Sequence, residues 1–255
     1  MAEKKKSLIQ SLDRALDILE IVRDSSTPVR STDIAQQLGL GIATAHNIIR
    51  SLYTRGYLAQ DDNSRYVLGP ECFKLCRVIS DVFEDLRQVV KNHVQKLSEN
   101  TGDTAFFGVE HHRSLYCISV SMGKGQLVVS DKQEWLEKMH CTAVGKIIIA
   151  ERGIDWFEKL ARQNPFKKFT GRTITSPAEM AAEIKGIKTS GYALSRDECS
   201  TGISALGIAV YDKNGKFVGA LGQALPTAYL DSGEIIPEER VELLRATAKK
   251  IQNDL

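Results

Sequence analysis

The sequence lacks any long apolar run. Its 255 residues contain no uninterrupted apolar stretch of about 18, so no transmembrane helix is predicted. The first six residues are mostly basic or acidic, and they lead into a helix-like pattern instead of the apolar core of a secretory signal. We therefore expect a cytoplasmic protein without a membrane partner, and its length suits two modest domains.

Cysteine is scarce as well. The chain has five cysteines, and their odd number and scattered positions argue against a disulfide framework. Cys72 and Cys76 lack the C-x-x-C spacing of common zinc sites and have no second ligand pair nearby, so we predict that they are core residues. His140 and Cys141 are adjacent, and adjacent residues on a helix face apart, so we predict a buried structural role for Cys141. No metal site is expected.

Complete nucleotide-binding motifs are also missing. Gly123 and Gly125 are not followed by the rest of a dinucleotide fingerprint, and no P-loop occurs. Nothing in the chain assembles an active site, so we expect neither a cofactor nor an enzyme.

An excess of positive charge is absent. The formal net charge is +2, and residues 1–70 hold nine Lys or Arg against eight Asp or Glu. A nucleic-acid-binding surface in this chain would therefore depend on how its charges are placed on one face.

What the first 70 residues do contain is a helical periodicity followed by a hairpin pattern. Apolar residues at intervals of three and four predict an amphipathic first helix, whose apolar set is Leu12, Ala15, Leu16, Ile18, Leu19 and Val22. Ser31 is predicted to cap a second helix, which Gly39 ends. The predicted elements are helices over residues 11–22, 31–38 and 41–55 and hairpin strands over residues 57–60 and 65–68.

Three short helices followed by a hairpin are typical of the winged helix-turn-helix, in which the start of the third helix enters the major groove of DNA. There Asn can pair with adenine, Thr and Ala can contact a thymine methyl, and Arg can bind guanine or phosphate. Hydroxyl and N–H groups at the start of the second helix suit a phosphate. The candidate DNA-binding residues are Ser31, Thr32, Ala43, Thr44, His46, Asn47, Arg50 and, on the wing, Arg65. Periodicity alone leaves open a small helical bundle with a polar surface.

The rest of the chain alternates between helical and strand-like patterns. Residues 71–102 look helical, first as a connector and then as one amphipathic helix. Ser176 is predicted to cap a later helix that has Pro177 in its first position and Glu179 in a capping box. Strands are predicted over 104–109, 115–120, 126–129, 192–195, 203–211 and 216–224, and helices over 142–151, 154–163, 177–189 and 237–253. Antiparallel strand pairs in an α+β domain follow from this order.

Several motifs are spaced along residues 8–225. In the first domain they are Ser11-Leu12-Asp13-Arg14-Ala15-Leu16-Asp17-Ile18-Leu19, Asp33-Ile34-Ala35-Gln36-Gln37-Leu38-Gly39-Leu40, Leu52-Tyr53-Thr54-Arg55-Gly56-Tyr57-Leu58 and Arg65-Tyr66-Val67-Leu68-Gly69. In the second they are His140-Cys141-Thr142-Ala143-Val144-Gly145-Lys146, Arg172-Thr173-Ile174-Thr175 and Gly191-Tyr192-Ala193. In this order they resemble the IclR-type transcriptional regulators.

The resemblance implies an α+β chain with an N-terminal winged helix-turn-helix, joined by a linker helix to a GAF-like effector-binding domain, in homodimers or tetramers. We place the DNA-binding domain at residues 1–70, the linker helix at 71–85 and the effector-binding domain at 86–255. Family members commonly regulate carbon-source or aromatic catabolism. They often open the third helix with Pro-Lys, where this chain has Gly41-Ile42. The operator sequence therefore does not carry over.

The resemblance also implies an effector site. The backbone N–H groups of Ala143 and Val144, at a predicted helix start, would meet an effector carboxylate. Relatives that bind small 2-oxo acids line the wall of this site with an acidic residue, a cysteine and serines. The corresponding residues in this chain are Ser195, Ala205, Gly222 and Ala224. Fewer polar side chains predict a larger organic acid, with aromatic acids included. The alternative is that these small residues only make room for bulkier neighbours.

The sequence thus predicts a regulator of a catabolic operon that binds a double-stranded DNA operator and responds to a small carboxylate effector. Whether it represses or activates does not follow. Two alternatives stay open: a ligand-sensing module that acts through protein partners and, less favoured, a small-molecule hydrolase.

Overall fold

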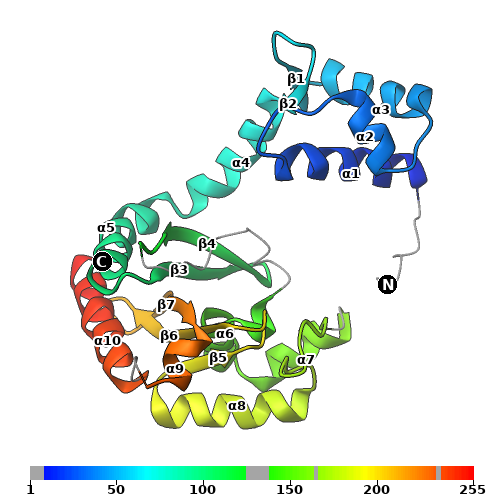
Figure 1. Ribbon diagram of the computed structural model, residues 1–255. Coiled ribbons are helices and arrows are strands. Elements are labelled where there is room, and N and C mark those ends of the chain that lie inside the picture. Colours follow the sequence, from blue (N-terminus) through cyan, green and yellow to red (C-terminus); the bar gives the residue numbers. More distant parts are fainter. Residues whose placement is uncertain (1–8, 125–137, 164–165, 234–236) are drawn as a thin grey trace. The chain divides into compact units, whose positions relative to one another are not determined.

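The computed structural model describes residues 9–124, 138–163, 166–233 and 237–255. Contacts divide the chain into an N-terminal unit, Met1–Val82, and a C-terminal unit, Phe83–Leu255. Both units are shown in Figure 1. Within the described ranges, no helix combines the length and the apolarity that crossing a membrane requires. The predicted strand over residues 126–129 lies outside the described residues.

The N-terminal unit consists of helices and a small hairpin, as predicted. Its elements in chain order are α1 (Gln10–Asp24), α2 (Ser31–Gln37), α3 (Ile42–Thr54), β1 (Leu58–Gln60), β2 (Tyr66–Leu68) and α4 (Pro70–Val82). The strands pair antiparallel, and Val29 adds a bridge to Tyr66 through two backbone hydrogen bonds of 3.0 and 2.7 Å. Ile18, Ile34, Ile49 and Leu58 are buried in the core that joins these elements.

Three local predictions for this unit are wrong. Of the apolar set predicted for α1, Ile18 and Val22 are buried, but Leu12 and Leu16 are 53% and 51% exposed, because the buried face of the helix is narrower than that set. Ser31 does not cap α2, because it is the first residue of the helix, and Arg30 holds the N-cap position without a side-chain hydrogen bond. Cys76 is exposed and Cys72 is only partly covered, because α4 buries none of its residues.

The C-terminal unit is built around a sheet of five antiparallel strands in the order β4-β3-β7-β6-β5. The strands are β3 (Thr104–His111), β4 (Ser114–Ser121), β5 (Ala193–Arg196), β6 (Ile203–Tyr211) and β7 (Phe217–Pro226). The helices are α5 (Glu84–Thr101), η2 (Met139–Cys141), α6 (Ala143–Arg152), α7 (Ile154–Gln163), α8 (Pro177–Ser190), α9 (Thr227–Asp231) and α10 (Pro237–Asp254). Ser176 caps α8 as predicted and accepts a hydrogen bond of 3.2 Å from the Glu179 N–H.

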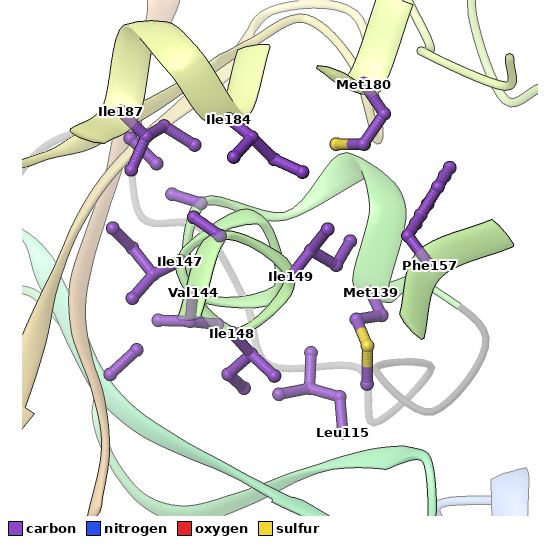
Figure 2. Packing of buried hydrophobic residues seen from close by; sticks show 14 of the residues in the cluster. Leu115, Met139, Val144, Ile147, Ile148, Ile149, Phe157, Met180, Ile184 and Ile187 are labelled. Carbon is purple, nitrogen blue, oxygen red and sulfur yellow. The ribbon is translucent and has the colours of Figure 1, made fainter. Parts of the chain in front are cut away.

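The two faces of this sheet carry separate cores. Residues such as Phe107, Leu206 and Leu221 pack with residues of α5 and α10, and these two helices contact each other. On the other face, α6 lies against the sheet and contacts α7 and α8. Figure 2 shows Val144 and Ile148 of α6 between Leu115 of β4 and Ile184 of α8. Alternation of inward and outward residues along the strands therefore separates two helical layers.

Candidate DNA-binding and effector-binding sites

The exposed face of α3 carries the residues predicted to read DNA. Ala45 and Ile49 of this helix are buried, so the helix can present only its opposite face. Gly39 adopts a φ of +61°, which lets the chain turn sharply between α2 and α3. The predicted residues on the exposed face are Ala43, Thr44, His46, Asn47 and Arg50, all of them exposed. The arrangement of α2, α3 and the hairpin is that of a winged helix-turn-helix.

The start of α2 holds the two residues predicted to contact phosphate. Ser31 is partly buried and Thr32 is exposed, and the Thr32 hydroxyl donates to the Asp33 carboxylate at 3.3 Å. The N–H groups of Asp33 and Ile34 are bound to the Arg30 carbonyl. The Asp33 charge in the first turn would oppose a phosphate, so this contact stays a prediction.

The wing turn is fixed by one carboxylate. Asp61 accepts hydrogen bonds from the N–H groups of Asn63 at 2.9 Å and of Arg65 at 2.8 Å. Its own N–H donates to the Arg65 carbonyl at 2.9 Å. These bonds hold the backbone of Arg65 immediately before β2, and Arg65 is partly exposed there.

The start of α6 is the predicted anion site. Thr142 caps the helix, and its hydroxyl accepts a hydrogen bond of 3.1 Å from the Gly145 N–H. The Lys146 N–H donates to the Thr142 carbonyl at 2.9 Å. Among the described residues, the N–H groups of Ala143 and Val144 have no acceptor, although both residues are fully buried. Two adjacent unpaired donors at a helix start suit an anion.

Three of the predicted wall residues lie in one row across the sheet. The strand register pairs Ser195 with Ala205 and Ala205 with Ala224, and Ala224 is paired in turn with Thr104. The Ser195 hydroxyl donates to the Cys141 carbonyl at 2.6 Å, which ties this row to the start of α6. Thr104 is a buried polar residue. Sequence patterns did not identify it as a member of this row, because its place there depends on strand register.

The fourth predicted wall residue, Gly222, lies two residues along β7 on the same face of the sheet, paired with Phe106 and Gly207. A methyl group on Gly222 would overlap the ring of Phe106 and approach Val144 Cγ1 to 2.9 Å. At this position the small residue therefore makes room for protein neighbours, which is the alternative that the sequence left open.

A buried charged cluster adjoins the start of α6. The side chain of Lys146 is 1% exposed, and its Nζ donates at 2.7 Å to each of Glu183 Oε1, Glu198 Oε1 and the Leu194 carbonyl. Burial raises the pKa of Glu198, and the nearby Lys146 charge only partly offsets this. The cluster links α6, α8 and β5. Sequence reasoning missed it because its members are far apart in the chain.

His140 and Cys141 do not form a catalytic pair. His140 Nε2 lies 2.9 Å from the Lys167 carbonyl, and burial lowers the pKa of the imidazole. The ring is packed against Phe166, with the ring centroids 4.6 Å apart. Cys141 is buried, as predicted, but its Sγ lies 2.7 Å from Cys199 Sγ. Among the described residues, no group of three or more His, Cys, Asp or Glu side chains is placed to hold a metal ion.

A winged helix-turn-helix in one chain with an α+β ligand domain defines a class of effector-binding transcriptional regulators. Residues 11–62 match the IclR helix-turn-helix domain and residues 79–253 match the bacterial transcriptional regulator IclR C-terminal domain. The chain belongs to the IclR family.

Individual relatives agree with this. The glycerol operon regulatory protein of Streptomyces coelicolor is 31% identical over 254 residues, which cover 97% of this chain and 96% of that protein. The solved structure of Thermotoga maritima IclR has a TM-score of 0.72 at 22% identity and covers 96% of this chain and 98% of its own. An IclR homolog of Microbacterium hydrocarbonoxydans, solved with 4-hydroxybenzoate, has a TM-score of 0.71 at 20% identity over 96% and 98% of the two chains. Since these families and relatives are transcriptional regulators, the hydrolase alternative is set aside.

Proposed function

We propose that this regulator binds an inverted-repeat operator as a homodimer and that a small carboxylate effector changes its affinity for that operator. The observation that carries the proposal is the exposed face of α3, where Thr44, Asn47 and Arg50 are aligned opposite a buried apolar face. Two such helices related by a twofold axis would contact half-sites about 34 Å apart, or a multiple of that distance. We further propose that the reading residues lie in a domain of residues 1–70, followed by a linker over 71–85 that consists of most of α4, Phe83 and the start of α5.

The apolar surface of α4 supports the dimer. This helix buries none of its residues, and its exposed residues Leu75, Val78, Ile79 and Val82 lie three and four residues apart, so they share one apolar face. An apolar helix face of this kind is costly in water, and a second copy of the chain would cover it. A helix held between two copies could also transmit a change of spacing to the DNA-reading helices.

Operator binding is tested by two substitutions with different expected signatures. We expect Asn47→Ala to weaken binding to the operator about 5–150-fold, corresponding to about 1–3 kcal/mol for a lost base contact, with little effect on random DNA. We expect Arg65→Ala to weaken binding to both DNAs and to lower the salt slope by about one, because phosphate contacts carry no sequence information. The measurement is a gel-shift titration at several salt concentrations, on an operator selected from random duplexes.

Thr54→Ala, at the exposed end of α3, is the matched control and should bind as the unchanged chain does. An equal loss on operator and random DNA for Asn47→Ala would contradict a role in sequence reading.

The effector site is proposed at the Ala143 and Val144 N–H groups, with Ser195, Ala205 and Ala224 as its wall and Gly222 behind it. The two unpaired donors support a carboxylate, and the structural relative solved with 4-hydroxybenzoate binds a molecule that carries one. Because Phe106 fills the space beside Gly222, room for a larger acid would have to come from the row of Ala205 and Ala224. Both small 2-oxo acids and aromatic acids therefore belong in a ligand panel.

We expect Ala143→Pro to weaken binding of the effector about 10–150-fold, because it removes one N–H donor to a charged group. Proline is well tolerated at the first position of a helix, and Thr142 already has the extended ψ of 148° that a residue before proline requires. Ala143→Gly keeps the N–H group and serves as the control, with little expected loss. The measurement is calorimetric titration with the acid that gives the largest thermal shift.

An equal loss in the Pro and Gly variants would mean that packing, and not the N–H group, governs binding.

The same titrations, repeated with operator present, test the coupling between effector binding and operator binding. Operator and effector must change each other's affinity by the same factor.

A further inference from the structure

Two cysteines from distant parts of the C-terminal unit lie in contact. Cys141 ends η2, and Cys199 lies in the turn between β5 and β6, 58 residues later in the chain. Their Sγ atoms are 2.7 Å apart, and neither cysteine is in a disulfide bond. Cys199 Sγ also donates to the Cys141 carbonyl at 3.1 Å. A disulfide bond is about 2.05 Å long, so a sulfur shift of less than roughly 1 Å would join them.

We propose that Cys141 and Cys199 form a reversible intramolecular disulfide when the protein meets a peroxide, and that this pair is a redox modification site at the start of α6. Cys199 is partly exposed, whereas Cys141 is fully buried, so a peroxide reaches Cys199 first. The hydrogen bond with Cys199, together with burial, raises the pKa of the Cys141 thiol, which makes Cys141 the poorer first nucleophile.

The chemistry balances with hydrogen peroxide as the two-electron oxidant. The Cys199 sulfur attacks one peroxide oxygen, the O–O bond breaks, one water leaves, and Cys199 becomes a sulfenic acid. The Cys141 sulfur then attacks the Cys199 sulfur, so that the S–S bond forms and the S–O bond breaks. The Cys141 proton leaves with the hydroxyl group as a second water. Two thiols are oxidised and one peroxide is reduced.

The pair is close to the groups proposed to bind the effector. The Cys141 carbonyl accepts hydrogen bonds from both Ser195 and Cys199, and Ala143 follows two residues later. Glu198, next to Cys199, is bound to Lys146 of α6. A disulfide would remove the Cys199 S–H donor and fix the turn after β5 to the start of α6. We therefore expect oxidation to change effector affinity, a consequence that rests on the proposed function.

The modification itself is tested without any effector. The full chain is treated with hydrogen peroxide, its remaining thiols are blocked with N-ethylmaleimide, and its peptides are mapped by mass spectrometry without reduction. We expect a linked Cys141–Cys199 peptide lighter by two hydrogen atoms than its two parts, and its release by dithiothreitol. Cys199→Ser should abolish it, whereas the control Cys72→Ser should retain it. The proposal would be overturned if Cys141 and Cys199 were still labelled by N-ethylmaleimide after oxidation, or if either formed a disulfide with another cysteine instead.

A second arm separates this inference from the proposed function. Carboxylates that stabilise the reduced protein are titrated into the reduced and oxidised chains, with an expected change in affinity of at least about tenfold. Cys199→Ser should show no change on oxidation. Equal affinities for the two forms of the unchanged chain would overturn the regulatory consequence. If no carboxylate binds either form while the linked peptide appears, the proposed effector fails and the modification site stands.

Discussion

Lys146→Met is expected to lower the free energy of unfolding of the C-terminal unit by about 3–5 kcal/mol, the usual cost of removing one partner from a buried ion pair. Methionine keeps most of the apolar length of lysine, so little packing is lost. What is lost is the ammonium group that binds Glu183, Glu198 and the Leu194 carbonyl, each at 2.7 Å. The buried Glu198 carboxylate would then face no cation within the cluster.

The loss should depend on pH. The pKa of Glu198 is raised above its ordinary value of 4.5 by burial, so between that value and the raised pKa the folded protein binds more protons than the unfolded chain. Stability therefore falls as the pH rises through this window. Without Lys146 the pKa of Glu198 rises further and the window extends upward. The variant should be weakest at neutral and alkaline pH and regain stability toward pH 4.5.

A double variant gives the sharpest check. Lys146→Met with Glu198→Gln removes the uncompensated charge and should recover a large part of the loss, with a flatter pH dependence. Arg162→Met breaks the exposed ion pair with Glu158 and should cost at most about 1 kcal/mol. The measurement is urea unfolding at several pH values. A double variant as unstable as Lys146→Met alone would argue that the charge of Glu198 is not the cause.

Sequence patterns predicted features that depend on residues close together in the chain, and they missed contacts between residues that are far apart in it. Periodicity and the turn glycines located α3, because a helix face is defined by residues three and four apart. The same reasoning failed for Leu12 and Leu16, since apolar spacing shows which residues share a face but not which neighbour covers them. The helical pattern predicted a helix start near Thr142, and only the family resemblance made that start a candidate effector site, which remains a prediction.

Sequence patterns could not predict the side-chain contacts around the start of α6. Lys146 meets Glu198 across 52 residues of sequence, and Cys141 meets Cys199 across 58. Both depend on β5 and its following turn lying beside α6, which follows from strand order and not from local pattern. Likewise, Thr104 joins the row of Ala224 and Ala205 only through strand register. Gly222 could be counted as small from sequence, but the Phe106 ring beside it could not be foreseen.

The second large effect is expected at Gly145, inside the first turn of α6. A methyl group there would overlap the Met139 carbonyl oxygen and lie 2.6 Å from Thr142 Oγ1, the atom that accepts the Gly145 N–H. The obstacle is backbone, so it cannot rotate away, and the helix start must shift. We expect Gly145→Ala to destabilise the C-terminal unit by about 3 kcal/mol, at the upper end of the cost of overpacking. The shift would also displace the Ala143 and Val144 N–H groups.

The matched control is Gly186→Ala, in the middle of α8. Gly186 is exposed, its added methyl would meet nothing within 4 Å, and its backbone is helical. The same change should therefore stabilise the protein by about 0.4–1 kcal/mol, because alanine has less conformational freedom to lose on folding. Urea unfolding measures the stability of both variants.

In Gly145→Ala, carboxylate binding should disappear at temperatures where the protein remains folded and the N-terminal unit still binds DNA. Equal stability of the two variants would mean that Met139 can move aside and that Gly145 does not set the position of the helix start.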